Sequence, residues 1–342
     1  MKQLIWTWLR LFIGVGIIGL LLWQLGTKAF LDGLRVIDAR AVLVALAIGL
    51  ATTVFSAWRW CLVARRLGLR LSLRGGVEDY YRALFLNAVL PAGVLGDVHR
   101  AVRHGRQEGD VGRGVRAVVL ERTAGQVVTV ASAVLMLLAR PAMIPLRFRA
   151  AVTITGAAVA VLAIVVPVVA VVAGRRWRHS RSTWRRASAV SLGDLRRGLL
   201  ARDAWPGVVL LSALTFAGHL ALFLVAARTA GATASVGRLL PLMVLTLLAM
   251  GLPVNVGGWG PREGVAALAF GAAGLGAAQG LTTAVVYGVL AFVASLPGAW
   301  VLLQPSLAEL RASGRRRDRG RVAALHTARE GTLALSVDAN AG

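Results

Sequence analysis

The segment Gly251-Leu-Pro-Val-Asn-Val-Gly-Gly-Trp-Gly-Pro-Arg-Glu-Gly264 interrupts a chain that otherwise consists largely of long apolar runs. Glycine and proline break helices, and irregular backbone at membrane depth persists only where protein or a wet cavity satisfies its N–H and C=O groups. Arg262 and Glu263 lie at this break, and ionisable residues inside a membrane mark functional sites. The segment therefore predicts a broken membrane helix with a site at the break.

An earlier segment resembles this one. Leu90–Arg100 can be laid over Leu252–Arg262 without a gap, and the two then match at leucine, proline, glycine and arginine. Paired Gly/Pro-broken apolar segments in two halves of a chain are typical of inverted-repeat transporters. We therefore expect two broken, re-entrant segments and a possible inverted repeat.

The composition places the chain in the membrane. Of its 342 residues, 57% are hydrophobic, and several runs exceed the roughly 18 apolar residues that mark a spanning helix. We predict an all-α polytopic membrane protein with about 6–8 transmembrane helices. The net charge of +24 comes from arginines clustered between the apolar runs, as the positive-inside rule expects, so it does not indicate nucleic acid. Cys61 is the only cysteine, which excludes an intrachain disulfide.

The apolar runs give a topology. Full spans are predicted at residues 11–25, 41–62, 115–139, 150–173, 205–227 and 281–304. Residues 78–96 are short and flanked by arginines on both sides, which favours a re-entrant segment, with an interfacial helix as the alternative.

The stretch around the second break can be read in two ways. Residues 239–256 and 264–278 form either a re-entrant hairpin or two further spans, so the choice between six and eight spans stays open. In both cases the arginines put both termini in the cytoplasm of a bacterial-type plasma membrane. The expected domains are a transmembrane domain, 1–305, and a basic, disordered cytoplasmic tail, 306–342.

Charged residues and glycines near the breaks are the candidate substrate-binding residues. The planar guanidinium fork suits phosphate, and glycines let backbone N–H groups approach it. For Glu263, a position in the first turn after Pro261 also predicts a helix-capping role. Arg262 either binds an anionic headgroup or pairs with Asp97 across the repeats. The candidates are Asn87, Asp97, Arg100, Glu121, Arg122, Gly257, Gly258, Gly260, Arg262 and Glu263.

Other polar residues give weaker signals. The stretch with Asp97, His99 and His104 is loop-like and lacks a zinc-site spacing. A lone histidine within a span, His219, is more typical of a packing residue than of a proton relay. The sequence has no P-loop, no Gly-x-Ser-x-Gly and no HExxH motif, so we predict no catalytic residue, metal or cofactor and favour a transporter over an enzyme.

The same residues carry a family likeness. The chain resembles the lysylphosphatidylglycerol synthase transmembrane-region family, also called flippase-like domain proteins, over roughly residues 10–305. The matching pieces are Asn87-x-x-Leu-Pro91, Gly96-Asp97-x-x-Arg100, Glu121-Arg122, Pro253-x-x-x-Gly257-Gly258-x-Gly260-x-Arg262-Glu263 and Pro297-Gly298.

The resemblance implies a function. In the family's namesake, a membrane domain that moves lysyl-phosphatidylglycerol precedes a soluble lysyltransferase domain. We expect only the transport half here, acting on an anionic or aminoacylated phospholipid or a polyprenyl-phosphate lipid. Anionic lipid headgroups are the expected partners, while a homo-oligomer and a separate lipid-modifying enzyme stay open. A membrane-embedded, lipid-linked glycosyltransferase and a non-catalytic scaffold remain the alternatives.

Overall fold

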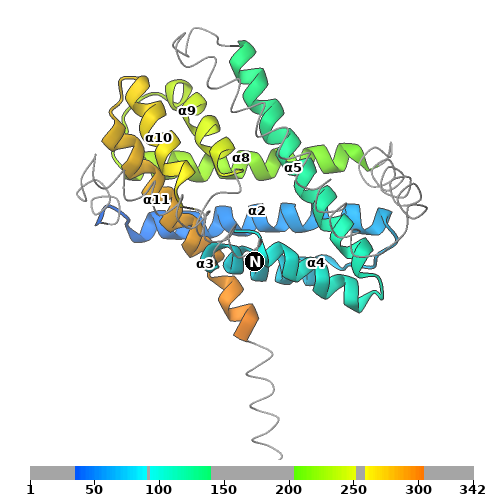
Figure 1. Ribbon diagram of the computed structural model, residues 1–342. Coiled ribbons are helices and arrows are strands. Elements are labelled where there is room, and N and C mark those ends of the chain that lie inside the picture. The colour runs from blue at the N-terminus through cyan, green and yellow to red at the C-terminus, as the bar shows by residue number, and fades with distance from the viewer. Residues whose placement is uncertain (1–34, 91–92, 140–203, 252–258, 304–342) are drawn as a thin grey trace, which may run out of the picture. The chain divides into compact units, whose positions relative to one another are not determined.

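The computed structural model describes residues 35–90, 93–139, 204–251 and 259–303, and much of this part of the chain forms long apolar helices. The chain divides into two compact units, 1–298 and 299–342, and the elements below belong to the first. The long helices are α2 (Ala39–Arg66), α5 (Val111–Ala139), α8 (Trp205–Thr229) and α11 (Ala277–Ser295) (Figure 1).

The four long helices confirm four of the predicted spans. Each is long and apolar enough to cross a membrane, and the apolar helical stretch that begins with α11 runs to Leu303. In the described residues every regular element is an α-helix, as predicted for an all-α membrane protein. The predicted spans at 11–25 and 150–173 and the tail 306–342 lie outside the described residues.

Both predicted breaks separate two short helices. In the first half, α3 (Leu73–Val89) precedes the break and α4 (Leu95–Gln107) follows it. In the second half, α9 (Val236–Ala249) and α10 (Pro261–Ala272) have the same relation to their break. The stretch expected to be a loop after Asp97 is therefore helical, and α10 begins three residues before the predicted start at residue 264.

The helix order repeats in the two halves. Each half has a long helix, two short helices separated by a break, and a second long helix. The packing repeats too. Each helix of the first half (α2, α3, α4 and α5) has a counterpart in the second half (α8, α9, α10 and α11), and wherever two helices pack together, their counterparts also pack together. For example, α4 packs on α5 and α10 packs on α11. This correspondence is the structural counterpart of the repeat seen at Leu90–Arg100 and Leu252–Arg262.

The two halves meet where α2 packs against α8 (Figure 1). The hydroxyls of Ser56 and Thr215 lie 3.4 Å apart, and Arg59 Nη1 donates to Ser212 Oγ at 3.0 Å. From the first of these contacts to the second, the residue number rises on α2 (Ser56 to Arg59) and falls on α8 (Thr215 to Ser212), so the two helices run antiparallel. Equivalent helices that run antiparallel are what an inverted repeat requires.

The first break depends on a close approach between α3 and α4. A Cβ added at Gly96 would lie 2.1 Å from the carbonyl oxygen of Ala83, so only glycine allows the two backbones to touch there. The contact fixes the start of α4, which carries several candidate site residues.

We predict that Gly96→Ala destabilises the protein by about 1–3 kcal/mol, since the methyl group must push two backbones apart. Thermal unfolding of the purified protein in detergent measures the effect. Gly112→Ala, on α5, is the matched control because its Cβ would meet only side-chain atoms at 3.4 Å. Equal stability of the two variants would contradict the close-contact interpretation.

Candidate functional site

Asn87 ties the two sides of the first break together. Its Oδ1 accepts a hydrogen bond from the backbone N–H of Gly96 at 2.8 Å, and its Nδ2 donates to Asp97 Oδ2 at 3.1 Å. The first bond satisfies one N–H at the start of α4, a helix without a side-chain N-cap of its own. The second bond orients the Asp97 carboxylate toward the arginines of the site.

Arg100 is the centre of the site. Its Nε donates to Asp97 Oδ1 at 2.9 Å, and its Nη2 donates to Glu121 Oε2 at 2.7 Å. The guanidinium carbon lies 4.7 Å from the ring centroid of Trp60 and 4.3 Å from that of Tyr80, within the range of cation–π attraction. The Arg100 side chain is completely buried, yet its Nη1 has no hydrogen-bond partner among the described residues.

Glu121 joins Arg100 to a second buried arginine. On α5, Glu121 Oε1 accepts from Arg59 Nε at 3.0 Å and also from Arg59 Nη2. The Tyr80 hydroxyl donates to the same oxygen at 3.1 Å. The Glu121 side chain is completely buried.

Arg122 forms the accessible edge of this network. Its Nη2 and Nε donate to Asp97 Oδ1 at 2.8 and 3.1 Å. The Arg122 side chain is 43% exposed and that of Asp97 is 14% exposed, whereas Arg100 and Glu121 are fully covered. The ion pair of Arg122 and Asp97 therefore lies between the surface and the buried arginine. We call Arg59, Asp97, Arg100, Glu121 and Arg122 the Arg100 cluster.

The Arg100 cluster has an excess positive charge. Among the described residues, three guanidinium groups meet two carboxylates in hydrogen-bonded contact. Burial lowers the pKa of the neighbouring His104, which opposes a further positive charge at this side chain. Within the described part of the chain, one positive charge of the cluster is thus left without a carboxylate.

Glu263 caps the helix that follows the second break. Its Oε2 accepts from the backbone N–H of Gly260 at 2.7 Å, directly before α10. Its Oε1 accepts from Arg262 Nε at 2.8 Å and from Arg262 Nη2. The predicted capping role is confirmed, and Arg262 pairs with this adjacent carboxylate instead of with Asp97.

Two aromatic rings flank Arg262, as two flank Arg100. The guanidinium carbon lies 5.0 Å from the Trp259 ring centroid and 5.3 Å from that of Tyr287. The Tyr287 hydroxyl lies 3.3 Å from Nδ1 of His219. We call Gly260, Arg262, Glu263 and Tyr287 the Arg262 cluster; its one arginine and one carboxylate balance.

The structure thus brings the candidate residues into two groups. Asn87, Asp97, Arg100, Glu121 and Arg122 form one connected network, and Gly260, Arg262 and Glu263 form another. Gly257 and Gly258 lie outside the described residues. In the described part of the chain, no group of three or more His, Cys, Asp or Glu side chains is placed to hold a metal.

Sequence reasoning missed the partners that complete these groups. The predicted span at 41–62 puts Arg59 near its end, whereas α2 continues to Arg66 and leaves Arg59 within the helix. A charge inside an apolar helix is itself a signal of a buried partner. Trp60, Tyr80 and Tyr287 carry no such signal, because aromatic residues in membrane helices are common for other reasons.

We predict that Glu121→Ala destabilises the protein by about 3–5 kcal/mol, because it leaves Arg59 and Arg100 buried without their shared carboxylate. Glu78→Ala is the control: this glutamate pairs with Arg74 at the surface, where a single ion pair contributes at most about 1 kcal/mol. Thermal unfolding in detergent compares the two. Similar losses would show that the Glu121 network contributes little to stability.

The chain matches a known protein family over most of its length. A search among curated proteins found no match, and a search among solved structures found none either. The family model described as "Lysylphosphatidylglycerol synthase TM region" matches residues 7–298. This range includes every candidate residue and most of the chain, so the protein belongs to that family, which consists of membrane proteins of lipid metabolism or transport.

Proposed function

We propose that this protein moves a phosphate-bearing, net anionic lipid across the bilayer, and that the headgroup phosphate binds to the Arg100 cluster. The observation that carries the proposal is the unbalanced guanidinium charge beside a broken membrane helix. A buried charge without a partner is costly, and arginine at membrane depth marks a substrate pathway. A phosphate would supply the missing negative charge.

The geometry suggests how the phosphate is received. Arg122 is the exposed arginine, so it makes the first contact, with a fork that can bind two phosphate oxygens. Asp97 then loses Arg122 but keeps Arg100 Nε and the Asn87 amide. Asp97 therefore still has two hydrogen-bond donors when Arg122 turns to the phosphate, which keeps the free-energy cost of this change of partner low.

The same charge distribution narrows the substrate class. A lipid with a phosphate and no cationic group neutralises the excess charge, whereas a lysyl group adds positive charge to a site that already has a surplus. We therefore favour phosphatidylglycerol or a polyprenyl phosphate over an aminoacylated phospholipid.

Lipid exchange in proteoliposomes tests the proposal. The purified protein is reconstituted with headgroup-labelled phosphatidylglycerol, lysyl-phosphatidylglycerol or a polyprenyl phosphate, and an impermeant quencher reports the exposed fraction. Accelerated exchange of an anionic lipid is the expected result. No acceleration with any of the three would contradict the proposal and favour the enzyme or scaffold alternatives.

We predict that Arg122→Gln slows this exchange about tenfold to a hundredfold, since a hydrogen bond to a charged group contributes about 1.5–3 kcal/mol. Arg122→Lys should recover part of the rate, because it keeps the charge but loses the fork. Arg113→Gln is the matched control: Arg113 lies on the same helix, is 42% exposed and pairs with Asp110. Equal slowing by the Arg113 and Arg122 variants would contradict the assigned site.

A further inference from the structure

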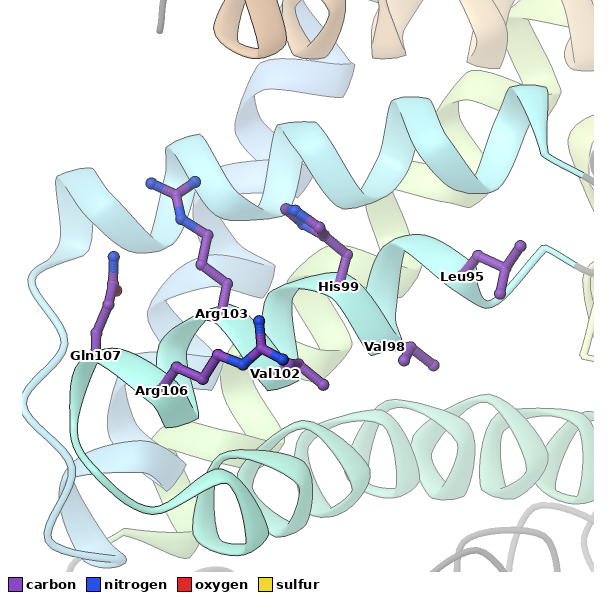
Figure 2. A pocket seen from close by; sticks show the side chains of 7 residues that line it. All are labelled: Leu95, Val98, His99, Val102, Arg103, Arg106 and Gln107. Atoms are coloured by element: carbon purple, nitrogen blue, oxygen red, sulfur yellow. The ribbon is translucent and has the colours of Figure 1, made fainter.

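Among the described residues no helix covers the outward face of α4 along part of its length, and the polarity of this face changes from one end to the other. At the N-terminal end, Val94, Leu95 and Val98 are 45%, 44% and 53% exposed. At the C-terminal end, Arg106 and Gln107 are exposed and Arg103 is partly exposed. All of these side chains except Val94 line an open hollow of about 590 Å³ (Figure 2).

Contacts to α5 place the start of α4 along the length of that candidate span. Asp97, near the start of α4, binds Arg122, which lies eleven residues after the start of α5 at Val111. At 1.5 Å per residue this is roughly 16 Å along the helix. The start of α4 therefore lies beside the interior of the α5 span and away from its first, charged turns.

The other end of α4 lies at a basic surface. Gln107 is separated from Val111 by a short turn, so the end of α4 is level with the start of the α5 span. The backbone N–H of Arg70, which follows α2, donates to Glu108 at 3.2 Å, so the end of α2 lies at the same level. Exposed Arg65, Arg66 and Arg70 add positive charge there. Basic residues at this level attract anionic headgroups.

We propose that the outward face of α4 is a docking site for one anionic phospholipid of this leaflet. Its phosphate contacts Arg106, and an acyl chain lies along Val98 and Leu95 toward the break. The face is basic beside the start of the α5 span and apolar farther along that span, which is the order of headgroup and acyl chain in a single phospholipid. Figure 2 shows these side chains along α4, with Leu95 and Gln107 at its two ends.

Neighbouring charges make Arg106 the main contact. Arg103 Nη1 donates to Oδ1 of the buried Asp79 at 2.9 Å, an oxygen that also accepts from Arg82, so the Arg103 guanidinium is anchored while Arg106 is exposed. Glu108, the nearest exposed carboxylate along the chain, accepts from the Arg70 backbone. His99, also exposed on α4, can add a hydrogen bond to a phosphate oxygen. The face ends beside Asp97 and Arg122, so a docked lipid would lie next to the Arg100 cluster.

Native mass spectrometry in detergent, with equal amounts of phosphatidylglycerol and phosphatidylcholine, tests this docking site. We expect the protein to retain phosphatidylglycerol several-fold more than phosphatidylcholine, and Arg106→Gln to remove most of that preference. Val98→Asp should reduce the binding of both lipids, since it places a charge beside the acyl chain. Arg74→Gln is the control, because Arg74 is exposed near the same end of the first half, on α3.

An unchanged preference in Arg106→Gln, or an equal loss in Arg74→Gln, would overturn the proposal. Displacement of the lipid by an equal concentration of soluble glycerol 3-phosphate would overturn it too, because it would indicate a plain anion site. The measurement involves no transport across a bilayer. Loss of preference in Arg106→Gln alongside absent lipid exchange would leave the docking site standing while the translocation proposal fails.

Discussion

The arrangement of the first half depends on one carboxylate that serves two buried arginines. Glu121 on α5 forms ion pairs with both Arg59 from α2 and Arg100 from α4, and all three side chains are almost fully covered. None of these charges can be buried without the others, because removing one partner leaves an uncompensated charge. The network therefore fixes three helices relative to one another at the level of the break, where apolar packing by itself would leave their register poorly defined.

The second half also contains a buried arginine that is paired with a glutamate and flanked by aromatic rings, but the partners come from different positions. Arg100 and Arg262 each follow a break, each bind a glutamate, and each lie between a tryptophan and a tyrosine ring. The glutamate comes from a neighbouring long helix in the first half and from the adjacent position in the second. A Cβ on Gly288 would lie 2.2 Å from Arg262 Nη2, so the Arg262 guanidinium occupies space that this glycine leaves open. The repeat thus preserves the environment of the arginine more closely than the identity of its partners.

Much of the fold was predictable because span composition is a strong signal, and the described long helices match the predicted runs. The helix α4 was not predicted, since its buried face carries Gly96, Arg100 and His104 while Leu95 and Val98 face outward. Helices are usually recognised in a sequence from an apolar buried face, and α4 lacks one because its buried face is partly polar. The site residues on the two breaks were found from their charge and position, but Arg59 and the flanking aromatics were not, because their role exists only through long-range contacts.

The two arginine clusters differ in charge, and this difference bears on function. Arg262 and Glu263 balance, and Glu263 is further held by the start of α10, so an anion gains little by approaching. The Arg100 cluster keeps one positive charge, with Arg122 partly exposed at its edge. If the halves of an inverted repeat exchange conformations during transport, the environments of the two arginines need not be equivalent at any one time. Under the translocation that we propose, the Arg100 cluster is then the one of the two that binds the anion in this geometry.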